Sequence, residues 1–144
     1  MTQPRPRRLL AVDPGSRRVG IAVSDELGMF AFARPALPGG DTVKVADSIA
    51  TIVAAEQIDE VVVGMPISLS GADTAQTTSV RAFVAELRRR LTVPVSVWDE
   101  RLSSVQAGRS VKGADRRKSG ELDSAAAAIV LQAVLESRRP GTGS

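Results

Sequence analysis

The stretch Leu9-Leu10-Ala11-Val12-Asp13-Pro14-Gly15-Ser16-Arg17-Arg18-Val19-Gly20-Ile21-Ala22-Val23 decides the fold. Two apolar runs flank a Pro-Gly pair, which predicts two strands joined by a tight turn, because Pro suits its first central position and Gly its second. Asp13 ends the first run, and a charge at the end of a buried strand is costly unless something binds it. Asp13 is therefore a candidate ligand for a metal or a phosphate-bearing substrate. The alternative is that its side chain only caps the turn.

The composition narrows the possible chemistry. The 144-residue chain contains no His and no Cys. This excludes Ser-His and Cys-His nucleophilic pairs, thiol redox chemistry and the usual zinc sites. Acid–base or metal chemistry must fall to Asp, Glu, Lys or bound water, and hard oxygen ligands favour magnesium or manganese. With 43% hydrophobic residues, we expect a single domain over residues 1–144, with disordered tails at about 1–6 and 139–144.

Charge and apolar runs bear on location and partners. The net charge is only +3, but basic residues cluster at 5–8, 17–18, 88–90 and 109–118. Ordinary solvated charge explains such clusters, and so does contact with nucleic-acid phosphates. The start of the chain lacks the apolar core of a signal peptide, and no run approaches the ~20 apolar residues of a membrane span. We therefore expect a cytoplasmic protein.

The order of elements predicts an α/β fold. Three strands within residues 7–36 precede strands that alternate with helices, and right-handed crossovers would add the later strands in parallel beside the first. The prediction is a mixed five-stranded sheet, with three antiparallel strands followed by parallel additions and with helices on both faces. The later elements are a helix at 42–56, a strand at 60–64, a helix at 75–91, a strand at 94–98, a helix from Ser103, a basic loop at 108–119 and a helix at 121–138.

Three carboxylates are predicted to meet at one edge of this sheet. Asp13 ends the first strand, Glu100 follows the last strand, and Asp123 lies in the first turn of the final helix, where four alanines allow close approach to the sheet. Each has an ordinary alternative: a turn cap, a surface ion pair with Arg101, or a favourable charge at a helix start. Clustered carboxylates repel unless cations neutralise them, and two divalent ions are the usual arrangement for phosphodiester cleavage.

Four segments resemble the motifs of the YqgF family, the Holliday-junction-resolvase-like proteins also described as pre-16S rRNA nucleases. They are residues 12–25, 63–66 with 70–71, 99–104 and 122–132. The resemblance implies an RNase H-like fold and metal-dependent cleavage of structured nucleic acid. It also implies that Asp13, Glu100 and Asp123 form the acidic triad and bind Mg²⁺ or Mn²⁺. Asp99 and Asp25 are candidates for the fourth carboxylate that many RNase H-like nucleases use.

Substrate contacts are hypotheses at this stage. Arginines near the carboxylates would bind phosphates beside the scissile bond, the loop from Gly64 to Gly71 would offer backbone N–H groups, and the basic loop 109–118 would clamp one strand. The aromatic residues are expected to lie mostly in the core, so recognition should follow shape and backbone charge rather than a base-stacking platform. The candidate substrate-binding residues are Arg17, Arg18, Arg101, Gly64, Lys112, Arg116 and Arg117, and the aromatic residues are Phe30, Phe32, Phe83 and Trp98.

Several functions compete. The leading interpretation is a metal-dependent endonuclease that processes the 5′ end of pre-16S rRNA in ribosome biogenesis. One alternative is a Holliday junction resolvase of DNA recombination, which should be a two-fold dimer, whereas an rRNA nuclease can act as a monomer. Another is a non-catalytic nucleic-acid-binding module. An ATP-dependent phosphotransferase would need a second domain, for which the chain is too short.

Overall fold

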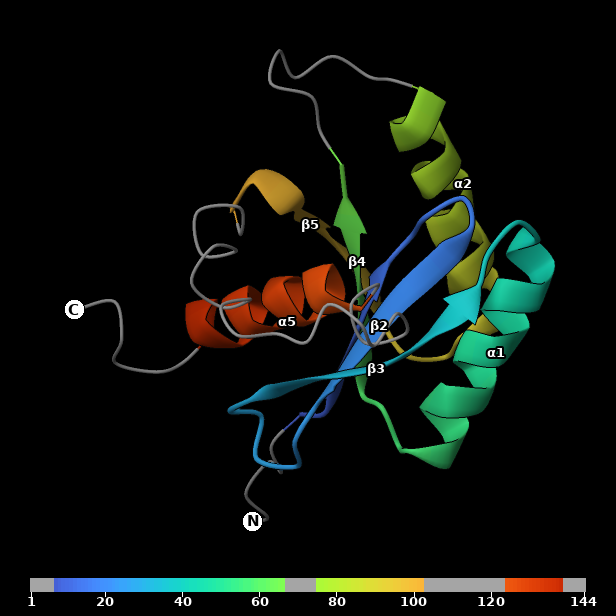
Figure 1. Cartoon of the computed structure of the whole chain (residues 1–144). Coiled ribbons are helices and arrows are strands. Elements are labelled where there is room, and N and C mark those ends of the chain that lie inside the picture. Colours follow the sequence, from blue (N-terminus) through green and yellow to red (C-terminus); the bar gives the residue numbers. More distant parts are fainter. Residues whose placement is uncertain (1–6, 67–74, 103–123, 139–144) are drawn as a thin grey trace.

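The computed structural model describes residues 7–66, 75–102 and 124–138 (Figure 1). Among the described elements, the first three are strands and the last is a helix. In chain order they are β1 (Leu9–Asp13), β2 (Arg18–Ser24), β3 (Ala31–Pro38), α1 (Thr42–Ala55), β4 (Glu60–Met65), α2 (Ala75–Arg90), β5 (Val95–Asp99), the 3-10 turn η1 (Glu100–Leu102) and α5 (Ala125–Ser137).

The sheet has the predicted mixed topology. Its strand order is β3-β2-β1-β4-β5, with β1–β2 and β2–β3 antiparallel and β1–β4 and β4–β5 parallel. The parallel strands β1, β4 and β5 therefore end at one edge, where the chain emerges at Asp13, Met65 and Asp99. This edge is where the sequence predicted the carboxylates to meet.

Two apolar layers follow from the alternation of side chains along the strands. Leu10 and Val12 of β1 face the helices α1 and α2, whereas Leu9 and Ala11 face α5. Figure 1 shows α1 and α2 on one side of the sheet and α5 on the other. Because the central strands are covered on both faces, they are almost continuously apolar, as buried parallel strands are. The predicted helices on both faces are confirmed.

The turn after Asp13 is fixed by the loop that precedes α1. The N–H of Gly39 donates to the carbonyl of Arg17 at 2.8 Å. A Cβ atom at Gly39 would lie 2.9 Å from the carbonyl oxygens of Gly15 and Ser16, closer than real Cβ atoms come. Only glycine allows this crossing, so the loop holds the turn and the two arginines that follow it in place.

A buried acidic residue ties the last helix to the opposite edge of the sheet. Glu60, at the start of β4, is only 4% exposed. It accepts hydrogen bonds from both Nη atoms of Arg138 at 2.8 and 3.0 Å and from Ser96 Oγ at 2.7 Å. The Arg138 hydrogen bonds, aided by Ser96, outweigh burial and lower the pKa of Glu60 below its ordinary value. Because Arg138 directly follows α5, this ion pair anchors the end of the helix.

Some predicted boundaries shift. The strand that begins at Glu60 extends to Met65, and the last helix begins at Ala125 rather than near residue 121. Asp123, which the sequence predicts to lie in the first turn of this helix, is outside the described residues. The helix predicted from Ser103, the basic loop and both tails lie outside the described residues. Within the described ranges, no helix combines the length and apolar character needed to cross a membrane.

Candidate active site

Asp13 and Glu100 come together at the edge where the parallel strands end. Asp13 is the last residue of β1, and Glu100 directly follows β5, with β4 lying between the two strands. Nevertheless, the two carboxyl groups hydrogen-bond to each other. The Glu100 side chain therefore spans the width of β4 to reach its partner.

Gly64 of β4 makes this crossing possible. In the parallel register, Val63 lies beside Val12 and Gly64 lies beside Trp98, so Gly64 sits level with Asp13. A Cβ atom at Gly64 would stand 3.1 Å from Glu100 Oε1 and 3.2 Å from its Cγ. The Glu100 side chain thus lies directly over the bare backbone of Gly64. The sequence places Gly64 among the candidate site residues, but it does not show that the absence of a side chain there leaves room for Glu100.

The two acids hydrogen-bond to each other, and the pKa of each is raised above its ordinary value. Burial is the largest influence on Glu100, and together with the hydrogen bond and the negative charge of Asp13 it raises the pKa of Glu100 to about 8. Burial also raises the pKa of Asp13, partly offset by the hydrogen bond from Glu100. Two adjacent carboxyl groups cannot both ionise cheaply without a cation. A bound cation would therefore allow both carboxyl groups to ionise.

Asp99 lies beside this pair but is engaged elsewhere. The guanidinium of Arg101 donates to both Asp99 oxygens, with Nη2–Oδ2 at 2.7 Å and Nε–Oδ1 at 3.1 Å. This contact lowers the pKa of Asp99 below its usual value. The alternative that Arg101 pairs with an acid is thus realised, but on Asp99. Arg101, predicted to bind substrate phosphate, is held by its neighbour.

The start of α5 is anchored close to Asp13. The register between β2 and β3 shifts between Val19 and Ile21, which interrupts the strand pairing. The Ile21 N–H donates to Ser124 Oγ instead, at 3.0 Å, and Ser124 is fully buried. Ile21 pairs with Val12 of β1, the residue that precedes Asp13. Ser124 therefore contacts the strand that lies next to β1, close to the level of Asp13. Asp123, next to Ser124 in the chain, lies outside the described residues.

Two arginines stand close to Asp13 in the chain. Arg17 and Arg18 follow the turn after Asp13, and both are solvent-exposed. With Gly15 and Ser16 they line an open cavity of about 570 Å³. Their predicted contact with substrate phosphates stays a prediction.

The structure corrects what the sequence predicted for two other residues, Gly64 and Asp25. Gly64 is not in a loop, because it lies inside β4, and its role is to leave room for Glu100. Asp25 follows β2, which runs antiparallel to β1, so it lies beyond the start of β1, roughly 17 Å along the strand from Asp13. There it accepts the N–H groups of Met29 and Phe30 at 2.7 and 2.9 Å. Asp25 is therefore not a fourth carboxylate of this site. The remaining basic candidates, Lys112, Arg116 and Arg117, lie outside the described residues.

The placement of the aromatic residues was only half right. Phe83 is buried and Trp98 packs against the layer beneath α5, as expected. Phe30 and Phe32 were wrongly assigned to the core: they are 56% and 54% exposed. Phe30 lies in the connection between β2 and β3, and Phe32 lies on β3, an edge strand of the sheet with a neighbouring strand on one side only.

The donor set fits a divalent metal. Asp13 and Glu100 offer hard carboxylate oxygens, the ligands that magnesium and manganese prefer, and a cation beside the pair would relieve the repulsion between two ionised carboxylates. Within residues 7–66, 75–102 and 124–138, no three acidic side chains converge on one point.

The family comparison covers nearly the whole chain. Residues 7–137 match a family model described as RuvX, Holliday junction resolvase. A protein of Koribacter versatilis, provisionally named a pre-16S rRNA nuclease, is 40% identical over 134 residues, which is 91% of this chain and 88% of the relative. A protein of Maridesulfovibrio salexigens with the same provisional name is 38% identical over 131 residues, covering 89% of this chain and 97% of the relative.

Solved structures share the fold at low sequence identity. RuvC of T. thermophilus in complex with a Holliday junction substrate superposes with a TM-score of 0.63 at 13% identity, covering 92% of this chain and 95% of that one. The fowlpox virus Holliday junction resolvase superposes with a TM-score of 0.55 at 14% identity, covering 90% and 99%. The RNase H-like fold predicted from the sequence is confirmed.

Proposed function

The chain belongs to the RuvX family of Holliday junction resolvases and is a nuclease, and from that premise we propose that it is a divalent-metal-dependent endonuclease that processes pre-16S rRNA. The observation that carries the proposal is the meeting of Asp13 and Glu100 across Gly64 at the edge where the parallel strands end. The choice of RNA follows the provisional names of relatives that are 35–40% identical over about nine-tenths of this chain.

Asp13, Glu100 and Asp123 would hold the metal. The anchoring of Ser124 on Ile21 supports the third assignment, because it ties the residue after Asp123 to the strand beside Asp13. A bound magnesium or manganese ion supplies Lewis acidity and a nucleophilic water near neutral pH, and a pair of such ions would serve both the attacking and the leaving oxygen. Asp99 remains the candidate for a fourth carboxylate, since it directly precedes Glu100.

The basic residues would position the substrate. Arg17 and Arg18 are exposed next to Asp13, where they can bind the phosphates on either side of the scissile bond. In hydrolysis the water oxygen would bond to phosphorus while the P–O bond to either the 3′ oxygen of the preceding nucleotide or the 5′ oxygen of the following one breaks, and that leaving oxygen would take up a proton. Holding the phosphate beside the carboxylates contributes to rate through proximity and orientation. Arg101 would join only by leaving Asp99, and Lys112, Arg116 and Arg117 would extend the contact along the strand.

The decisive experiment compares two substrates and two variants. Pre-16S rRNA carrying its 5′ extension and a four-way DNA junction are incubated with the protein in Mg²⁺ or Mn²⁺. Asp13→Asn should lower cleavage a hundredfold or more, because a metal ion contributes several kcal/mol to phosphodiester cleavage. Asp25→Asn is the matched control, since it removes an acid at the other end of the sheet and should cleave like the wild type. Full cleavage by Asp13→Asn would rule out the metal-dependent mechanism.

Two other functions give different outcomes. A junction resolvase, favoured by the family description, would cut only the four-way junction, in paired symmetric positions, and would sediment as a dimer. A non-catalytic binding module would bind either substrate, cleave neither, and be unaffected by Asp13→Asn. An rRNA nuclease would cleave the RNA as monomer or dimer, and we expect it to act in the cytoplasm, where ribosome precursors are.

A further inference from the structure

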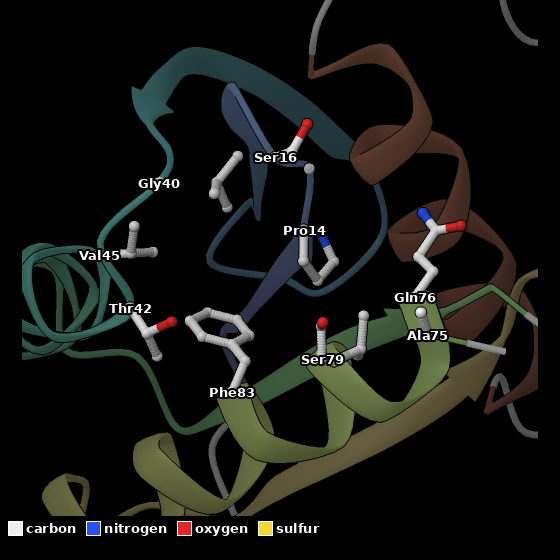
Figure 2. A pocket seen from close by; sticks show the side chains of 12 residues that line it. Pro14, Ser16, Gly40, Thr42, Val45, Ala75, Gln76, Ser79 and Phe83 are labelled. Atoms are coloured by element: carbon white, nitrogen blue, oxygen red, sulfur yellow. The ribbon is translucent and has the colours of Figure 1, made fainter.

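A second cavity lies on the opposite face of the sheet from α5, between the turn that follows Asp13 and the helices α1 and α2. Its volume is about 540 Å³, within the range of sites that take small organic groups. Its wall begins at Pro14, the residue after Asp13, and continues through the first turns of α1 and α2. Figure 2 shows Pro14, Thr42 and Phe83 around this space. A group that enters this cavity could therefore belong to a nucleic-acid strand that is bound at Asp13.

The cavity has an apolar floor and a polar rim. The floor residues are almost fully buried: Val45, Val80 and Phe83 are 5%, 3% and 6% exposed. The rim residues are solvent-exposed and carry neutral groups that both donate and accept hydrogen bonds. They are Ser16, Thr42, Gln76 and Ser79. In Figure 2 the hydroxyl of Ser79 points toward Pro14 and the Thr42 hydroxyl toward the ring of Phe83.

The charge of the lining selects the kind of group. None of the described residues that line this cavity has a charged side chain. The neighbouring open cavity, by contrast, is lined by Arg17 and Arg18. A phosphate would be drawn to the arginines, whereas the neutral cavity suits a flat apolar ring with hydrogen-bonding edges. A side-chain amide such as that of Gln76 can make paired hydrogen bonds to such an edge.

We propose that this cavity binds one unpaired nucleobase of the strand being cleaved, next to the scissile phosphate. The proposal rests on the proposed function, because it takes its nucleobase from the nuclease substrate. The base would enter with its faces against the apolar floor and its edge at the rim, while Arg17 and Arg18 hold the flanking phosphates. A base already single-stranded enters without the cost of unstacking, so the cavity would favour cleavage in or beside unpaired segments.

The test is a cycle that changes both protein and substrate. The probe is an RNA hairpin with single-stranded flanks, in which an abasic residue replaces each flanking nucleotide in turn. Binding is measured with Ca²⁺ in place of Mg²⁺, so that cleavage is not needed. One abasic position should weaken binding to the wild type by about 5- to 150-fold, which is the factor for one stacked base. Equal binding at all positions would overturn the proposal.

The protein arm fills the cavity. Ser79→Trp places a large ring at an exposed rim position and should abolish the difference between the parent and abasic hairpins. Ala85→Trp is the matched control, because it adds the same ring at another exposed position of α2, away from the lining. It should keep the wild-type difference. A folded Ser79→Trp protein that still discriminates would contradict the assignment.

A third measurement does not depend on variants that must fold. Adenosine and inorganic phosphate are titrated separately into ¹⁵N-labelled wild-type protein. Adenosine should shift the amide resonances of Gln76 and Ser79, and phosphate should shift those of Arg17 and Arg18. The reverse assignment would refute the base site. If the protein cleaves RNA but binds the parent and abasic hairpins equally, only the base site is refuted. If it distinguishes the two hairpins but cleaves no substrate, only the nuclease mechanism is refuted.

Discussion

Replacing Gly64 with alanine tests the active-site geometry through a residue that carries no chemistry of its own. The added methyl group would lie 3.1 Å from Glu100 Oε1, 3.2 Å from Cγ and 3.3 Å from Cδ. Since carbon contacts are most favourable at about 3.5–4.0 Å, the Glu100 carboxyl group must move by about half an ångström. Its hydrogen bond to Asp13 would be stretched or broken.

The size of the effect follows from that displacement. A misplacement of about 1 Å in a catalytic arrangement can cost 10²-fold in rate, so Gly64→Ala should lower cleavage by about tenfold. Gly64→Val, with two further carbons, should lower it by a hundredfold or more. Stability should change little for Gly64→Ala: alanine loses less backbone entropy on folding, by about 0.5–1 kcal/mol, and the crowding of Glu100 offsets this gain.

The assay measures initial cleavage rates at several Mg²⁺ concentrations, beside the midpoint of thermal unfolding. Val62→Ile is the matched control, because it adds one methyl group to the same strand, on the same face, two residues from Gly64. That variant should lose some stability through overpacking and keep its cleavage rate. A folded Gly64→Ala protein that cleaves at the wild-type rate would show that Glu100 does not lie over Gly64 in the working enzyme.

Three further results are expected. Ser124→Ala leaves the Ile21 N–H buried without its acceptor, so the free energy of unfolding should fall by about 1–3 kcal/mol in urea titrations; no change would mean that the start of α5 is not anchored there. Glu60→Gln should lower the free energy of unfolding at neutral pH but not in acid. Folding lowers the pKa of Glu60, so its carboxylate stabilises the folded protein above pH 4.5, its ordinary pKa, and this stability is lost as the pH falls through the lowered pKa. A loss of stability that is the same at every pH would contradict this. Replacing Arg17 and Arg18 together by Gln should weaken RNA binding and reduce the slope of log K against log salt by about 1.5, and an unchanged slope would remove them from the phosphate contacts.

The sequence predicts most of the sheet because local signals decide it. The apolar runs on either side of Pro14 and Gly15 have no helical period and are too apolar for a surface, so they read as buried strands. The parallel placement of β4 and β5 follows from the handedness of crossovers. Helix boundaries are less well determined by local sequence. The pattern predicts a helix from residue 121, whereas α5 begins at Ala125, and the hydroxyl of Ser124 accepts the N–H of Ile21 from a strand over 100 residues earlier.

The roles of single residues depend on register, which local sequence does not contain. Nothing near Gly64 in the chain reveals that Glu100 crosses it, because that contact requires β4 to lie between β1 and β5 in a specific alignment. The exposure of Phe32 likewise depends on β3 being an edge strand. Short-range patterns give the elements, but which side chains share one point in space is fixed by pairing between distant segments.

Strand direction decides which carboxylates can cooperate, and Asp13 and Asp25 illustrate it. Each stands at the end of an apolar strand of the same hairpin, so the local sequence does not distinguish them as candidate ligands. Because β1 and β2 are antiparallel, their ends face opposite edges of the sheet, and only Asp13 shares an edge with the ends of β4 and β5. Glu100 qualifies because β5 is parallel to β1 through β4. The acidic site is thus a consequence of the two parallel pairings, and any residue proposed to join it must reach that same edge, as Ser124 already does from the start of α5.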